Sequence, residues 1–182
     1  DLENRAFLNQ IGVVDCGGTS CSQPSVFELE PLPPLHPASG MALATPFAIQ
    51  ISGDDSTLVL TAAGSNKLFT VDTASGDVLG RVDVGWVPRG IALESTAGGA
   101  PLRAWVLNAV ADTVTVVDLS SPTNLLVERT IALEDPTFPE VKSGRLAFNN
   151  ANASSTSTFS CASCHPDGHT DQLLWVLGGP QC

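Results

Sequence analysis

The chain has 182 residues, of which 43% are apolar and 15% charged, a composition that can build a packed core and argues against disorder. The net charge of −11 should repel nucleic acid and anionic lipid and should attract basic partners. No apolar run is long enough to predict a membrane span. The first ten residues lack the basic and then apolar stretches of a signal peptide, which fits a mature form, a fragment or a cytosolic protein.

Residues 1–45 contain two cysteines, Cys16 and Cys21, which enclose only Gly-Gly-Thr-Ser. This flexible loop can close a local disulfide, so we expect an oxidising compartment. Cys182, at the end of the sequence, has no obvious partner. The segment also holds a strand-like stretch at Ser25–Glu30 and a Pro-rich stretch at 31–37. We interpret it as a possible part of a further copy of the repeat that follows.

Residues 46–134 contain an internal repeat. Pro46-Phe-Ala-Ile49 matches Pro88-Arg-Gly-Ile91, 42 residues later. "LVLTAAGSNKLFTVDTASG" (58–76) matches "AWVLNAVADTVTVVDLSSP" (104–122) at an offset of 46, and Arg81 matches Arg129 at 48. The extra residues fall in turn-like stretches, which is where structural repeats tolerate insertions.

Each copy predicts four short strands, since runs of Val, Ile, Leu and Thr alternate with Gly, Asp, Asn and Ser turns. We predict strands at 46–52, 57–62, 67–72 and 77–84, and again at 88–93, 103–108, 113–118 and 126–133. A four-stranded antiparallel unit recurring every 40 to 50 residues is typical of a propeller blade. Propellers close with about four to eight blades, so we expect missing sequence or another chain to complete this one.

The amino-acid sequence of the repeat resembles that of the YVTN-type β-propeller family. Leu58 to Thr61 and Trp105 to Asn108 stand where that family has its "Tyr-Val-Thr-Asn" strand, and Val71-Asp72 and Val117-Asp118 stand at its "Val-Asp" position. The resemblance implies a propeller over roughly residues 46–134. It says little about function, because propellers host many activities.

Residues 137–182 lack the strand-and-turn pattern of the repeat. "EVKSGRLAFNN" (140–150) predicts a short amphipathic helix with an internal glycine. After a polar run comes Cys161-Ala-Ser-Cys164-His165. Two thiols at this separation can form thioether bonds with the vinyl groups of a haem, and the adjacent imidazole can reach its iron. The motif therefore favours one covalent haem c, with His165 as the proximal iron ligand.

Two other interpretations of the motif stay open. Cys161 and Cys164 could form a redox or structural disulfide, although the βαβ setting of thioredoxin-like motifs is absent. Zinc could be held by Cys161, Cys164, His165 and His169, although adjacent Cys164 and His165 would strain tetrahedral coordination.

The surroundings of the motif resemble the start of the cytochrome c module in the di-haem cytochrome c peroxidase superfamily. The matching positions are Gly144, Arg145 and Phe148 before the motif and Asp167, Gly168 and Asp171 after it. Some members of that superfamily carry YVTN-type blades ahead of the haem module. The resemblance implies thioether attachment at Cys161 and Cys164 and iron ligation by His165. The family's activity uses two haems, and this sequence has one motif.

A sixth iron ligand would decide between electron transfer and peroxide chemistry. Met41 and His36, in one irregular loop, are the candidates for a distal ligand. His169 would lie on the same helical face as His165, so we expect a surface or propionate contact from it. Calcium is a further cofactor to consider, since Asp54-Asp55 and Asp167 with Asp171 are acidic turns, but such turns usually face only water.

Taken together, the sequence predicts a mainly β protein. Residues 1–45 form an N-terminal segment, residues 46–136 two propeller blades, and residues 137–182 a short, partly helical c-type haem segment. The expected function is electron transfer to a redox partner protein. Because this chain is acidic, we expect the surface of that partner to be basic. The alternatives are a fragment of a di-haem peroxidase-like oxidoreductase and an interaction propeller without haem. We expect a bacterial periplasmic, cell-surface or extracellular location.

Overall fold

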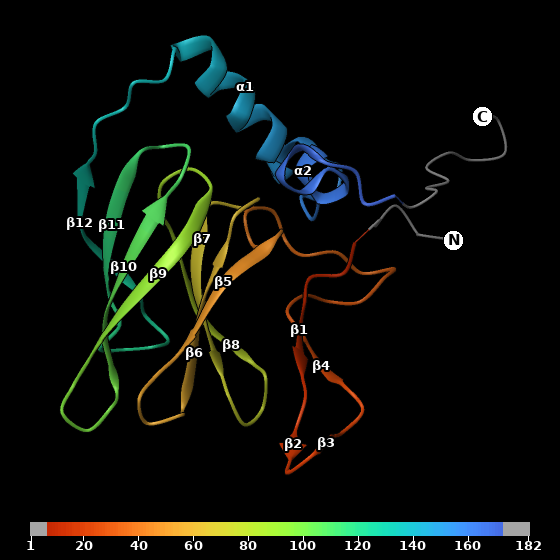
Figure 1. Ribbon diagram of the computed structural model, residues 1–182, viewed down its shortest axis with the longest axis vertical. Helices are drawn as coiled ribbons and strands as arrows, with labels where there is room; N and C mark the ends of the chain where they lie inside the picture. The colour runs from red at the N-terminus through yellow and green to blue at the C-terminus, as the bar shows by residue number, and fades with distance from the viewer. Residues whose placement is uncertain (1–6, 173–182) are drawn as a thin grey trace, which may run out of the picture.

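A computed structural model describes residues 7–172, and its main elements are two four-stranded antiparallel sheets (Figure 1). In each sheet the strands follow one another in sequence order. The first sheet contains β5 (Pro46–Ile51), β6 (Thr57–Ala62), β7 (Lys67–Asp72) and β8 (Val78–Asp83). The second contains β9 (Pro88–Ser95), β10 (Pro101–Asn108), β11 (Thr113–Asp118) and β12 (Leu126–Ala132).

The eight predicted strands are confirmed, with ends that differ by at most two residues. One detail of the repeat alignment is wrong. Thr70 pairs with Gly80 in the first sheet, and the matching Val116 pairs with Arg129 in the second. Arg129 therefore corresponds to Gly80 rather than to Arg81, because the turn between β11 and β12 holds one more inserted residue than the alignment assumed.

The first sheet is covered on both faces, which explains its nearly continuous apolar strands. On one face Val59 and Leu68 pack against the second sheet, in a cluster completed by Ala104, Val106, Val117, Leu119 and Leu125. On the other face, Leu60 and Phe69 pack against Ile11, Leu29 and Leu43 of the N-terminal segment. The strands β5 and β9 contact each other, as the first strands of neighbouring blades do around a propeller axis.

The N-terminal segment forms two small antiparallel pairs. β1 (Gln10–Val13) pairs with β4 (Ser25–Glu28), and β2 (Cys16–Gly17) pairs with β3 (Ser20–Cys21). Cys16 and Cys21 are joined by a disulfide. The predicted strand at Ser25–Glu30 is thus two residues shorter, and β1 was not predicted.

β1 and β4 pair as the third and fourth strands of each sheet do. In each pair, the N–H of the residue just after the later strand donates to the carbonyl of the residue just before the earlier strand. These bonds run from Val84 to Asn66 (2.9 Å), from Leu133 to Asp112 (2.9 Å) and from Leu29 to Asn9 (3.2 Å). The geometry is that of the outer half of a blade, which supports the prediction that residues 1–45 contain part of one.

Asparagine side chains tie consecutive units together. Thr45 and Val87, each just ahead of the first strand of a sheet, have φ of 54° and 57°. The Thr45 N–H donates to Asn9 Oδ1 (3.2 Å), and the Val87 N–H donates to Asn66 Oδ1 (2.9 Å). The carbonyls of Thr45 and Val87 accept from Ala63 and Ala109, both at 2.9 Å. Each unit therefore holds the entry point of the next.

The C-terminal segment contains α1 (Pro139–Asn149), η1 (Ala151–Ala153), α2 (Cys161–Cys164) and η2 (Pro166–Gly168). The predicted helix at 140–150 is confirmed one residue earlier, beginning with proline at its first turn. The segment lies across one end of the sheets (Figure 1). It is anchored there by Leu146 packed on Ala63, Val87 and Val110 and by the Ala151 N–H, which donates to the Gly64 carbonyl (2.9 Å). Within residues 7–172, no helix is long and apolar enough to cross a membrane.

Candidate functional site

The Cys-x-x-Cys-His motif forms a single helical turn, α2. The His165 N–H donates to the Cys161 carbonyl (3.0 Å) and closes the turn. Ahead of it, the Ser160 N–H donates to Ser163 Oγ (3.0 Å). Cys161 and Cys164 stand at positions i and i+3 of this turn, which share one side of it, and His165 follows as the C-cap residue with a φ of −120° and a ψ of 63°.

The motif turns its smallest residue toward the protein. Ala162 is buried, whereas Cys161 and His165 are exposed and Cys164 is half-buried. Both thiols are free, so the structure does not join Cys161 to Cys164. The chemically active groups therefore lie on the side of α2 that residues 7–172 leave open, away from the sheets.

One ring nitrogen of His165 is already committed. Its Nδ1 lies 3.0 Å from the backbone carbonyl of His169. A carbonyl oxygen can only accept, so this bond requires the proton on Nδ1. Nε2 is then left with its lone pair, which is the form that ligates a metal, and such a partner fixes both the tautomer and the ring orientation. The Phe148 ring lies 6.4 Å from the imidazole, measured between centroids.

The environment of Cys164 keeps it protonated. Burial raises the pKa of the Cys164 thiol, and electrostatic interactions with Asp171 and Cys161 raise it further. A raised pKa is the opposite of what a nucleophilic or metal-binding thiolate needs. It speaks against a redox-active thiol at this position and is compatible with a thiol that adds to a carbon–carbon double bond.

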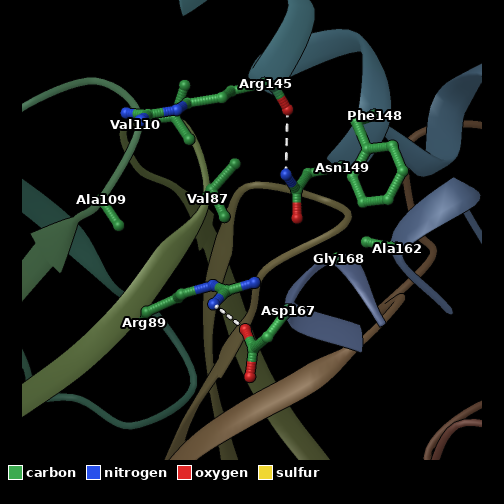
Figure 2. A pocket seen from close by; sticks show the side chains of 10 residues that line it. All are labelled: Val87, Arg89, Ala109, Val110, Arg145, Phe148, Asn149, Ala162, Asp167 and Gly168. Atoms are coloured by element: carbon green, nitrogen blue, oxygen red, sulfur yellow. Dashed lines mark hydrogen bonds and ion pairs between the residues drawn. The ribbon is translucent and has the colours of Figure 1, made fainter. Parts of the chain in front are cut away.

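A pocket of about 390 Å³ lies behind α2, between α1, η2 and the end of the second sheet. Figure 2 shows its lining, which includes Val87, Arg89, Arg145, Phe148, Ala162 and Asp167. Four of the positions named in the sequence comparison, Arg145, Phe148, Asp167 and Gly168, thus meet at one place. None of Cys161, Cys164 and His165 lines this pocket, so the pocket lies behind the motif and does not contain its thiols or its imidazole.

Arg89 connects the sheets to the segment that follows the motif. Its guanidinium carbon lies 4.6 Å from the centre of the Phe47 ring, and its Nη1 lies 2.7 Å from Asp167 Oδ1 (Figure 2). It also lines a second pocket of about 240 Å³, together with Phe7, Thr45 and Pro166. Sequence reasoning missed this residue, because a pair separated by 78 positions leaves no local pattern.

The candidate distal ligands lie apart from the motif. His36 is exposed in the 31–40 loop. Met41 is 44% exposed, and its carbonyl accepts from the Arg81 side chain. The hydrogen bonds and ring contacts of the described residues join neither of them to His165.

The prediction that His165 and His169 share a helix is wrong. α2 ends at Cys164, and Asp167 interrupts η2 with a φ of 51° and a ψ of 29°. His169 is therefore extended. It supplies its backbone carbonyl, rather than its side chain, to His165.

Other metal sites find little support. Among residues 7–172, no group of three or more His, Cys, Asp or Glu side chains gathers around one point. A haem needs one protein ligand on one side of the iron and at most one on the other, so this finding bears on zinc and calcium and not on haem. Asp54 accepts from Ser52 Oγ (2.6 Å) and Ser56 Oγ (2.9 Å) within its own turn, and these bonds lower its pKa. Cys182 lies outside the described residues.

The sheets define the class of protein: solved structures similar to this chain are β-propellers. They include the periplasmic gluconolactonase of Pseudomonas aeruginosa (22% identity, TM-score 0.52, 71% of this chain and 35% of that one). The β-propeller domain of Cps50 (Swd1) from Myceliophteria thermophila is similar (17%, TM-score 0.52, 70% and 42%). These likenesses concern the fold alone.

Part of the chain is also similar to hydrazine synthase of Kuenenia stuttgartiensis. The identity is 31%, the match covers 50% of this chain and 24% of that one, and the TM-score is 0.42. The chain spans between 24% and 42% of the length of these structures. No family model matches the chain, and no curated protein matches its sequence.

Proposed function

We propose that this chain is a c-type haem protein that acts in electron transfer, with one haem attached at Cys161 and Cys164 and its iron bound by His165. One observation carries the proposal. The motif forms one helical turn, and the His169 carbonyl holds the proton of His165 on Nδ1 (3.0 Å), which leaves Nε2 available. A disulfide site would not need that arrangement, and zinc, which could use the same Nε2, would need further ligands that do not gather around one point among residues 7–172.

The bound haem would supply one-electron redox chemistry at its iron. The chain's own residues do the rest. Each thiol would add across a vinyl group, with sulfur bonding to one carbon and the thiol hydrogen moving to the other, so that no electron is gained or lost. His165 would hold the iron through its Nε2 lone pair. Phe148 and buried Ala162 support the turn from behind.

The compartment and the partner follow from two features of the chain. The Cys16–Cys21 disulfide favours an oxidising location, and we propose the bacterial periplasm or cell surface. The net charge of −11 favours a redox partner with a basic surface, whose association would weaken as salt screens the attraction.

The second candidate is a fragment of a di-haem peroxidase-like oxidoreductase. The observation that favours it is the convergence of Arg145, Phe148 and Asp167 on one pocket, since these are positions of the family resemblance. Peroxide chemistry would require an open sixth position and a second haem.

The first experiment asks whether haem is attached. The chain is produced with a c-type haem maturation system and examined by haem staining and intact mass. We expect the mass of one haem on the wild type and on the Cys16→Ser/Cys21→Ser control, and its loss in Cys161→Ala/Cys164→Ala. A wild type without covalent haem refutes the proposal and leaves an interaction propeller.

The second experiment separates the two candidates. For an electron carrier, we expect the reduced spectrum to stay unchanged when carbon monoxide is added, because the sixth position is filled. A carbon monoxide adduct would instead favour the peroxidase-like fragment.

A further inference from the structure

Arg89 breaks the repeat at the place where the sheets meet the haem segment. Pro46-Phe47 and Pro88-Arg89 are equivalent in the two sheets. Where the first sheet has a phenylalanine, the second has an arginine, and the guanidinium of Arg89 stacks over that same Phe47 ring at 4.6 Å. The ring limits the positions that the guanidinium can take, so its contact with Asp167 Oδ1 (2.7 Å) is directed.

Asp167 has a backbone that needs holding. Its φ of 51° and ψ of 29° are left-handed values, which aspartate tolerates better than most L-residues but which remain less favourable than helical or extended values, so contacts of its side chain help to hold the turn. Its side chain is 70% exposed, against 30% for Arg89. Among the described residues, the ion pair with Arg89 is the hydrogen-bonded contact of this side chain.

The turn at Asp167 aims the carbonyl that orients His165. The Gly168 N–H donates to the His165 carbonyl (3.1 Å), and the His169 N–H donates to the Pro166 carbonyl (3.0 Å). These bonds fold the chain back, so that the His169 carbonyl reaches His165 Nδ1 at 3.0 Å. A continuous series of contacts therefore runs from Phe47 through Arg89 and Asp167 to the imidazole.

We propose that Arg89 is a positioning residue: through Asp167 it holds the His169 carbonyl against His165 and so sets the tautomer and orientation of that ring. The sheets would then adjust the iron ligand as well as carry it. The effect on the imidazole stands without haem, whereas the effect on an iron rests on the proposed function.

The first test uses the chain without haem. At pH 8, where imidazole is neutral, nitrogen-15 spectra of the histidine rings report which nitrogen carries the proton. We expect the Nδ1–H form at His165 in the wild type. In Arg89→Ala and in Asp167→Ala we expect a mixture with more of the Nε2–H form, since the carbonyl is no longer held in place.

The matched control is Arg129→Ala. Arg129 also lies over an aromatic ring, that of Trp105 at 5.3 Å, but on β12. We expect no change at His165. Asp167→Asn guards against a change in the turn itself, because asparagine tolerates the left-handed backbone as aspartate does and removes the charge of the pair. The double variant Arg89→Ala/Asp167→Asn should shift His165 no further than Arg89→Ala alone.

The second test uses the haem-loaded chain. Loss of the Nδ1–H···O=C bond makes His165 a poorer electron donor, which disfavours oxidised iron. We expect Arg89→Ala to raise the reduction potential by up to about 59 mV, which for one electron corresponds to a tenfold change in the redox equilibrium constant. Arg129→Ala should leave it unchanged.

The outcomes separate the two ideas. A wild type that takes up no haem refutes the proposed function, while the tautomer measurement still decides the role of Arg89. A wild type that binds haem, with Arg89→Ala matching Arg129→Ala in both tautomer and potential, refutes the role of Arg89 and leaves the haem proposal standing.

Discussion

At the scale of single residues, the junction between the two sheets depends on Asn66 and Val87. Val87 is 2% exposed and holds a φ of 57°, a conformation that costs a β-branched residue about 1–2 kcal/mol. The bond from its N–H to Asn66 Oδ1 (2.9 Å) offsets part of that cost. Asn66 itself has a φ of 57°, which asparagine tolerates better than most residues.

We predict that three substitutions of Asn66 separate these effects. Asn66→Asp keeps an acceptor and should leave stability nearly unchanged. Asn66→Gly keeps the backbone freedom but loses the acceptor, which should cost about 1–3 kcal/mol. Asn66→Ala loses both and should cost about 1–2 kcal/mol more. Urea denaturation measures the differences, and exposed Asn124→Ala is the control. Equal stability of Asn66→Asp and Asn66→Gly would show that the side-chain bond contributes nothing.

At the scale of elements, α1 is fastened to the sheets by Lys142. Its Nζ contacts Asp135 in the loop before the helix and the Ala111 carbonyl (3.3 Å) in the turn between β10 and β11. The bond from Lys142, with one from the Thr137 N–H, lowers the pKa of Asp135 from 3.8 to about 2. The carboxylate therefore stays charged in the folded chain at a pH where the unfolded chain would protonate it.

This lowered pKa predicts an acid-sensitive attachment of α1. A depressed folded-state pKa gives stability that is present above the unfolded value and is lost as pH falls from about 4 towards 2. We expect wild type and Asp135→Asn to differ in urea stability at pH 6 and to converge at the acid end. Lys142→Gln should behave like Asp135→Asn. A difference that stays constant from pH 6 to pH 2 would contradict the assignment.

The elements also show what sequence could and could not predict. The eight sheet strands were predictable, because β-branched runs sit between Gly, Asp and Asn turns. β1 is short and was missed, although Asn9-Gln-Ile-Gly-Val-Val-Asp15 matches Asn66-Lys-Leu-Phe-Thr-Val-Asp72 and could have revealed it. The Cys-x-x-Cys-His motif could be recognised in the sequence. The partner of His165 could not, because a backbone carbonyl has no residue type and the fold alone brings it there.

At the scale of the whole molecule, the outer side of the second sheet is left exposed by residues 7–172. Every residue of β12 is exposed, including the apolar residues Leu126 (54%), Val127 (42%) and Ile131 (38%). In a propeller, the next blade covers this region. In the 182-residue chain it is an apolar surface next to a strand edge, and both features favour self-association.

We predict that polar substitutions on β12 reduce self-association without a loss of stability. Leu126→Thr/Ile131→Lys should lower the sedimentation-detected oligomer at high concentration and change unfolding by no more than about 0.5 kcal/mol. The control is Val116→Thr on β11, where the side chain is fully buried. It should destabilise the fold and leave the surface unaltered. Unchanged self-association of the β12 variant would show that the chain associates through a surface other than β12.

The sequential strand order in both sheets bears on how the chain is made. Each strand pairs with its immediate neighbour in the sequence, so strand pairing requires only short loops to close and should be fast for an all-β protein. Chains emerge from their N-terminus and fold in that order. We therefore expect both sheets to be complete while Cys161 is still being delivered. Attachment of a prosthetic group would then take place on a platform that already exists, and not on an extended chain.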